Sequence, residues 1–275
     1  MQNISIYCLT MDPSHESKIL NLNFIPVGLG EEKFSNNFLT DKKGENISFK
    51  NKFYGEYTFH YWLWKNHLDK INTNWIGFCQ YRKFFVKQKI NNELNKLTFK
   101  ELDNYLIKQI DENDNLNYDC ILGDLLSVND FRFTKFVKKN ILKFIKQPSL
   151  IFNKKKRNIK LHFDIFHGEG NLDKAIDVLD EKERDGFREY VEKKTNFHPH
   201  NMFICKKEYL VKYYEIIFPW LNKCEKLFGF ELQGYGMRRI YGFLAERFLS
   251  YWFSKNCNVK KLPILVKDLS DYKNL

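Results

Sequence analysis

The chain has 275 residues, of which 43% are hydrophobic and 17% aromatic, enough to bury a sizeable core. Only 6 prolines and 13 glycines are present, which excludes collagen-like and low-complexity chains. The formal net charge of +11 suits nucleic acid, an anionic membrane surface or a phosphate-bearing small molecule as partner, or simply solubility.

The six cysteines lie far apart and form no C-x-x-C pair, so neither a zinc site nor a disulfide framework is expected. This usage is typical of a reducing cytoplasm. The amino-terminal segment has no signal-peptide pattern, and no run approaches the roughly 18 apolar residues of a membrane-spanning helix. We therefore expect a cytoplasmic protein.

The first half of the chain alternates strands and helices. Residues 4–10 and 74–79 read as buried strands, and residues 23–30 as a second extended piece. Between them, residues 54–71 form an aromatic helix, buried on several sides, with a stripe of Tyr57, Tyr61, Trp64 and Leu68. Residues 86–117 read as a loop and a polar helix, and 118–124 as another strand.

The second half continues the alternation. A helix is expected at 171–181, with Asn171 as its N-cap. A strand then runs into a helix from residue 199 onward, with a kink at Pro219. A last helix covers residues 235–253. Strand–helix alternation with short strands predicts an α/β fold with a largely parallel sheet.

The strand at 74–79 ends in a polar cluster, Gln80, Tyr81 and Arg82. Ligands of open α/β sheets bind at the carboxyl ends of strands. The sequence contains no phosphate-binding glycine loop and no D-x-D metal motif. A guanidinium can neutralise a diphosphate without a metal, so Arg82 is a candidate for that role. The alternative is a surface ion pair.

Other polar groups are less specific. His162 and His167 lie near carboxylates and are compatible with a general base or with loop contacts. Arg239 and Glu246 are two helical turns apart around Gly242, an arrangement that suits a sugar or phosphate, or an interhelical ion pair. In the segment 131–161, Lys residues alternate with Phe residues. This pattern is compatible with a solvated helix face, a nucleic-acid site or a site that contacts a membrane surface.

Four stretches together resemble one family: "GENISFKNKFYGEYTFHYWLWKN", "WIGFCQYRKFF", "HNMFICKKEYL" and "RRIYGFLAERFL". They are similar to bacterial capsular and exopolysaccharide biosynthesis proteins, once grouped as a domain of unknown function and now placed among glycosyltransferases with galactofuranosyltransferase-type members. The match covers nearly the whole chain in order. It departs at Tyr57, Gln80 and Lys83, where the family usually has Leu, His and Arg.

The resemblance implies a GT-A-like Rossmann-type single domain, with a mostly parallel central sheet flanked by helices. We expect residues 1–130 to form a nucleotide-sugar-binding half and residues 131–275 an acceptor-side half. It also implies transfer of a sugar, of galactofuranose type, from a UDP-sugar to a lipid-linked or polymeric surface glycan. Contact with the inner face of the bacterial inner membrane would involve the basic 131–161 region, and no nucleic acid is expected as partner.

The resemblance carries over the motif positions Asn46, Glu56, Tyr81, Arg82, Asn201, Arg239 and Glu246, and the role of each is our own inference. The expected catalytic residues are Glu246, first choice as base, Asp124, second choice, and Arg82. The expected donor-binding residues are Thr10, Gly28, Asn46, Gln80, Tyr81, Arg82, Lys83 and Arg239. The expected acceptor-binding residues are Glu56, His167, His200 and Asn201.

No cofactor is expected, although a divalent metal held by scattered ligands such as Asp119 and Asp124 is an alternative. A second alternative is a basic binding module without enzymatic activity, which would bind nucleic acid or a polysaccharide-assembly partner.

Overall fold

The computed structural model describes residues 3–90, 96–111, 117–129 and 157–272. The chain forms two compact units. Unit 1 comprises Met1–Asp124, Met202–Tyr214 and Asn256–Leu275, and unit 2 comprises Leu125–Asn201 and Glu215–Lys255. The expectation of one domain with halves at 1–130 and 131–275 stays a prediction.

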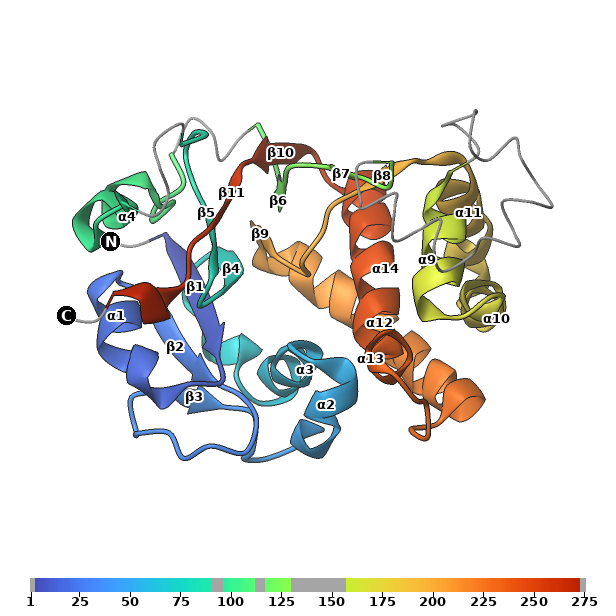
Figure 1. Cartoon of the computed structure of the whole chain (residues 1–275), viewed down its shortest axis with the longest axis horizontal. Helices are drawn as coiled ribbons and strands as arrows, with labels where there is room; N and C mark the ends of the chain where they lie inside the picture. Colours follow the sequence, from blue (N-terminus) through green and yellow to red (C-terminus); the bar gives the residue numbers. More distant parts are fainter. Residues whose placement is uncertain (1–2, 91–95, 112–116, 130–156, 273–275) are drawn as a thin grey trace. The chain divides into compact units, whose positions relative to one another are not determined.

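Unit 1 is built on a mixed sheet that is mostly parallel (Figure 1). The strand order is β10-β6-β9-β4-β1-β2-β3, with β5 and β11 paired beside it. The strands are β1 Ile4–Thr10, β2 Ile25–Gly28, β3 Leu39–Thr40, β4 Trp75–Gln80, β5 Lys83–Phe85, β6 Cys120–Gly123, β9 Phe203–Lys206, β10 Val259–Leu262 and β11 Ile264–Val266. Of the seven strands in this order, only β9 is antiparallel to its neighbours, β4 and β6. The predicted α/β fold with a mostly parallel sheet is confirmed.

The central strands are almost continuously apolar because both faces of the sheet are covered. In β4 all residues except the terminal Gln80 are buried. The helices of unit 1 include α1 Glu16–Asn21, α2 Asn51–Tyr54, α3 Tyr57–Asn66 and α4 Phe99–Tyr105, with short 3-10 turns at Pro13–His15, Ser48–Lys50, Leu68–Lys70 and Leu269–Asp271. A capping box between Thr98 and Glu101 begins α4.

The aromatic helix is buried on several sides, as expected, but two residues of its expected stripe are not fully buried. Tyr57 and Leu68 are buried, but Tyr61 and Trp64 are only partly buried. The buried surface of α3 is wider and includes Phe59, His60, Trp62 and Leu63. The helix packs on several sides, so a single period of 3.6 residues does not describe its environment.

Unit 2 is mainly helical (Figure 1). Its helices are α9 Ile159–His167, α10 Asn171–Asp177, α11 Glu181–Lys193, most of α12 Lys207–Phe228, α13 Tyr235–Arg238 and α14 Ile240–Asn256. Short strands β7 Leu126–Ser127 and β8 Asn196–Phe197 pair with each other. The rings of Phe187, Trp220, Phe248 and Tyr251 meet in its core.

Two local expectations for this half are wrong. The last helix is interrupted at Arg239, whose ψ of 25° is outside the helical range, so α13 and α14 are separate. The N-cap of α10 is Gly170, in the left-handed region, and Asn171 is its first helical residue. α12 contains Pro219 within one unbroken helix, and the kink expected there stays a prediction. Most of the basic region, residues 130–156, lies outside the described residues.

Candidate functional site

The carboxyl ends of the parallel strands bring together several residues expected to bind the donor. Thr10 is in register with Gly28, and Leu9 with Gln80, so β1, β2 and β4 end at one edge of the sheet. β9 runs against both β4 and β6, so β6 ends at that same edge. This carboxyl edge is where open α/β sheets bind ligands.

Arg82 lies at the tip of the turn that joins β4 to β5, with Tyr81 beside it. Its side chain is exposed, and its guanidinium is 5.5 Å from the centre of the Tyr81 ring. The Tyr81 ring stacks on His15 with centroids 5.0 Å apart. Within the described part of the chain, no carboxylate pairs with Arg82. The charge at this strand end is therefore available to an anion.

Three other expected donor residues have evident structural roles. The Thr10 hydroxyl bonds to Nδ1 of His15 at 2.8 Å and accepts from the Asp12 N–H. A Cβ on Gly28 would collide with the Phe34 ring, so a glycine is needed there for packing. The Asn46 side chain accepts from the Ser48 N–H and donates to the Gly44 carbonyl, which shapes its own loop. Lys83 begins β5.

Asp41 is a buried carboxylate that the sequence analysis did not single out. It directly follows β3, which is parallel to β2, so it lies at the carboxyl edge. It is 1% exposed, and neither carboxylate oxygen has a hydrogen-bond partner among the described residues. Burial raises the pKa of Asp41, while the Thr58 side chain opposes part of the rise. The Thr58 hydroxyl proton is already donated to the Gly55 carbonyl.

Asp124 also lies at the carboxyl edge, just after β6. Its carboxylate is half-exposed and 3.8 Å from Nζ of Lys89. Asp119 precedes the same strand and pairs with Lys206 at 2.8 Å. The two carboxylates are therefore about 17 Å apart at strand geometry and cannot share one metal ion. In the described ranges, no group of three or more His, Cys, Asp or Glu is arranged to hold a metal.

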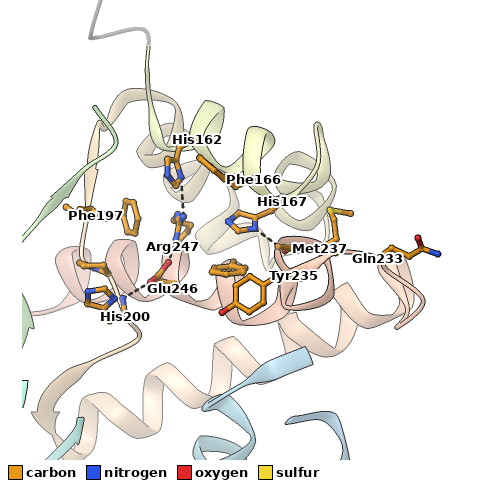
Figure 2. Close-up of a pocket in the computed structure, with 15 residues that line it drawn as sticks. His162, Phe166, His167, Phe197, His200, Gln233, Tyr235, Met237, Glu246 and Arg247 are labelled. Carbon is orange, nitrogen blue, oxygen red and sulfur yellow. Dashed lines mark hydrogen bonds and ion pairs between the residues drawn. The ribbon is translucent and has the colours of Figure 1, made fainter. Parts of the chain in front are cut away.

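A second feature is a cavity of about 700 Å³ within unit 2 (Figure 2). Its walls come from α9, β8, α13 and α14. The lining is mixed aromatic and polar, and consists of Leu126, His162, Phe166, His167, Phe197, Pro199, His200, Gln233, Gly234, Tyr235, Gly236, Met237, Phe243, Glu246 and Arg247. It thus includes four of the residues singled out from sequence: His162, His167, His200 and Glu246.

An ion pair lies in the wall of this cavity. Arg247 is 2% exposed and pairs with Glu246, and its guanidinium lies 3.9 Å from the centre of the Phe197 ring. Arg247 Nη2 donates to Nδ1 of His162 at 3.3 Å. Burial and the Arg247 charge together lower the pKa of His162 to about 2, so this imidazole is neutral. His162 is therefore a positioning contact and not a proton carrier at neutral pH.

The chain beside the ion pair has an unusual backbone. His200 and Asn201 have φ of 81° and 52°, the left-handed region that non-glycine residues rarely adopt. The His200 N–H donates to Oε1 of Glu246 at 2.6 Å, and the Asn201 amide donates to the Gly242 carbonyl at 3.2 Å. Asn201 therefore covers the face of α14 at Gly242, which a sugar or phosphate site between Arg239 and Glu246 would have used.

The remaining expected residues are dispersed. His167 lines the cavity, where its Nδ1 donates to the Gly236 carbonyl at 3.0 Å and its ring stacks on Phe243. Arg239 lies beside Tyr235, with Nη1 3.4 Å from the Tyr235 hydroxyl. Glu56 precedes α3 in unit 1, whereas His167, His200 and Asn201 belong to unit 2.

A search for helices able to cross a membrane finds no candidate of sufficient length and apolarity among the described residues. No curated protein is significantly similar to the sequence.

The fold is shared with a solved glycosyltransferase structure. The apo structure of the WbbM bifunctional glycosyltransferase superposes with a TM-score of 0.71 at 20% identity, over 96% of this chain and 45% of that chain. This chain thus spans less than half of WbbM, and the likeness confirms the expected fold. The mannosyltransferase Ktr4p from S. cerevisiae matches over 95% of this chain and 70% of that one at 10% identity, but its TM-score of 0.35 is too low to indicate a shared fold.

The sequence profile of one family, described as Domain of unknown function (DUF4422), matches residues 7–257. This range includes all four stretches that carried the resemblance. It also extends from β1 to the end of α14, and so covers both the carboxyl edge and the cavity. The chain therefore belongs to the family of domains of unknown function described as DUF4422.

Proposed function

We propose that the protein is a glycosyltransferase that moves a sugar from a nucleoside diphosphate donor to a glycan acceptor. The observation that carries the proposal is Arg82. It is an exposed guanidinium without an ion pair in the described chain, at the carboxyl edge of a sheet whose fold is that of a glycosyltransferase structure. A diphosphate is the ligand that such a group and position suit.

In the proposed reaction the bond between the anomeric carbon and the diphosphate oxygen breaks, and an acceptor oxygen bonds to that carbon. The electron pair of the broken bond leaves with the diphosphate, whose charge Arg82 stabilises with help from Lys83. The acceptor hydroxyl loses its proton to a carboxylate. We assign this role to Asp124, because it is half-exposed and lies at the same edge as Arg82.

The separation of these two groups fits the chemistry. β4 and β6 are two strand spacings apart in the sheet, so their carboxyl ends are roughly 10 Å apart. That leaves room for a sugar ring between the diphosphate and the base. Glu246, the first choice as base from sequence, accepts hydrogen bonds at both carboxylate oxygens, which suits a binding role better.

Finer parts of the proposal rest on sequence alone. UDP as the nucleotide, a galactofuranose-type sugar and a capsular or surface polysaccharide acceptor come from the resemblance. Action without a metal comes from the missing D-x-D motif. A place at the cytoplasmic face of a bacterial inner membrane comes from the cysteine usage and the basic 131–161 region. The segment expected to contact that membrane falls mainly in residues 130–156, which the structure does not describe.

Titration calorimetry with UDP tests the donor site. We expect wild-type protein to bind UDP equally with magnesium or with chelator, and Arg82→Ala to bind at least about tenfold more weakly, because a charge-assisted contact to the diphosphate is lost. Lys70→Ala is the matched control. Lys70 is an exposed cation of unit 1 that precedes the amino end of β4, at the opposite edge of the sheet.

Equal affinity of Arg82→Ala and wild type would show that Arg82 is not on the diphosphate. Loss of UDP binding in chelator would show that a metal contributes. If the protein bound no nucleoside diphosphate at all, the donor assignment itself would be wrong.

A further inference from the structure

The cavity of unit 2 combines apolar rings with a few polar groups (Figure 2). Phe166, Phe197 and Phe243 contribute ring surfaces, and Tyr235 adds a ring that is 69% exposed. The Tyr235 and Phe243 rings meet edge to face, with centroids 6.1 Å apart. An exposed aromatic side chain that borders a cavity is a typical contact for a flat, partly apolar ligand.

The polar groups of the cavity place a hydrogen-bond acceptor and a hydrogen-bond donor side by side. Glu246 is a carboxylate in the wall, and Arg247 is the guanidinium that neutralises it. The Nε–H of Arg247 is buried and has no hydrogen-bond partner in the part of the chain that the structure describes. A buried donor left unpaired lowers stability, so a ligand oxygen that reaches it is favoured.

The backbone that shapes one wall is held in a high-energy conformation. His200 and Asn201 both have positive φ, and α14 holds them through Glu246 and the Gly242 carbonyl. Strain of this kind persists where the surrounding structure imposes it and is concentrated at ligand sites. The wall next to the ion pair is therefore pre-formed.

We propose that this cavity binds one uncharged sugar residue. Sugar rings present apolar C–H faces that stack on aromatic rings, and hydroxyls that both donate and accept. The rings of Tyr235 and Phe243 take the C–H face, Glu246 accepts from one hydroxyl, and Arg247 donates to its neighbour. The sugar is part of the acceptor glycan, an assignment that rests on the proposed function.

An acidic sugar fits less well. The guanidinium charge is already offset by Glu246, so a second carboxylate would meet a like charge in a desolvated site. Neutral His162, whose Nδ1 accepts from Arg247, adds no positive charge. A sugar that carries only hydroxyl groups therefore matches the charge balance of the cavity.

Saturation-transfer NMR tests the inference with the methyl β-glycosides of glucose and galactose and with methyl β-glucuronide. We expect transfer to at least one neutral glycoside, weaker transfer to the glucuronide, and a loss of about threefold or more in Tyr235→Ala. Tyr235 is exposed, so the variant should fold. Phe49→Ala, which removes a ring that is 74% exposed in unit 1, is the matched control and should behave like wild type.

Glu246→Gln is a second variant, because it keeps the side-chain shape but changes the hydroxyl acceptor, and it should also weaken transfer. Thermal melting establishes that each variant is folded. The inference is overturned if no neutral glycoside shows transfer, or if Tyr235→Ala and Phe49→Ala behave alike. UDP titration on the same samples separates the two proposals. UDP binding without glycoside binding removes only the sugar site, and glycoside binding without UDP binding removes only the donor assignment.

Discussion

Asp41 shows how a single residue can point to function through its unfavourable environment. A carboxylate in a low-dielectric site without hydrogen bonds disfavours its own charged form. Burial raises the pKa of Asp41 for this reason. The residue lies at the same edge of the sheet as Thr10 and Gly28, at the end of the neighbouring strand β3. A nucleotide that donated a hydrogen bond to it would relieve the unfavourable burial.

We expect Asp41→Asn to raise the free energy of unfolding by about 1–3 kcal/mol at pH 7, since it removes the charge but keeps the size. The sign follows from linkage. A carboxyl whose folded pKa is raised loses stability as pH rises from its unfolded value through its folded value. The gain should therefore disappear near pH 3, where the carboxyl is protonated in both states. Chemical denaturation at several pH values measures it.

Asp41→Asn also separates a functional role from a structural one. Greater stability together with weaker UDP binding is the pattern of a site residue. Greater stability with unchanged UDP binding would remove Asp41 from the donor site. Lower stability at pH 7 would show that the carboxylate has a favourable partner.

At the scale of elements, α14 holds the segment before β9 along one face. Gly242, Glu246 and Ser250 are spaced four residues apart and therefore lie on one side of the helix. Ser250 accepts from the His198 N–H at 2.8 Å, Glu246 from His200, and the Gly242 carbonyl from Asn201. This ladder fixes the two left-handed residues beside the cavity.

The backbone conformation at His200 is testable by comparing two substitutions that both remove the imidazole. We expect His200→Val to be less stable than His200→Gly by about 1–2 kcal/mol, because a β-branched residue is strained at φ of 81° and glycine is not. Both variants keep the N–H that binds Glu246. The free energy of unfolding of each, measured by denaturant titration, gives the difference.

Lys194 is the matched control, since it is exposed and has an extended backbone with φ of −85° and ψ of 144°. The Lys194→Val variant should be at least as stable as the Lys194→Gly variant. If glycine and valine ranked the same way at both positions, the left-handed conformation of His200 would not be the cause.

At the scale of the whole molecule, each unit contains a deeply buried neutral histidine. In unit 1, His60 is fully buried, its Nδ1 is 2.7 Å from the Tyr214 hydroxyl, and burial lowers its pKa to about 3. In unit 2, His162 has a pKa of about 2 beside the Arg247 cation. The unfolded chain binds protons at these positions near pH 6.5, whereas the folded chain does not.

Stability should therefore fall as pH drops below about 6.5. Each histidine contributes a loss of about 2 kcal/mol between pH 7 and pH 5, because the unfolded state takes up the extra proton. His60→Gln and His162→Gln should each remove one such contribution, in the unit that contains the residue. Denaturant unfolding at the two pH values measures the effect. An unchanged pH dependence in the double variant would contradict the buried, neutral state of both.

Much of the architecture was predictable because it depends on local pattern. Continuous apolar runs identified β1, β4 and β6. The strand-end position of Arg82 also followed from sequence, since an apolar strand that breaks into polar residues marks its own end. Helix boundaries such as Arg239 and Asn171 were wrong because a cap depends on dihedral angles that neighbouring elements impose.

The sequence by itself determined the fold class, the family and the location of an arginine at a strand end, since these depend on residue order along the chain. The tertiary structure alone decided which side chains share a site. It placed Asp41 at the same carboxyl edge as Thr10 and Gly28, and it gave Glu246 partners in Arg247 and the His200 backbone. Burial, pairing and backbone strain are properties of contacts between distant segments, and a sequence pattern does not contain those contacts.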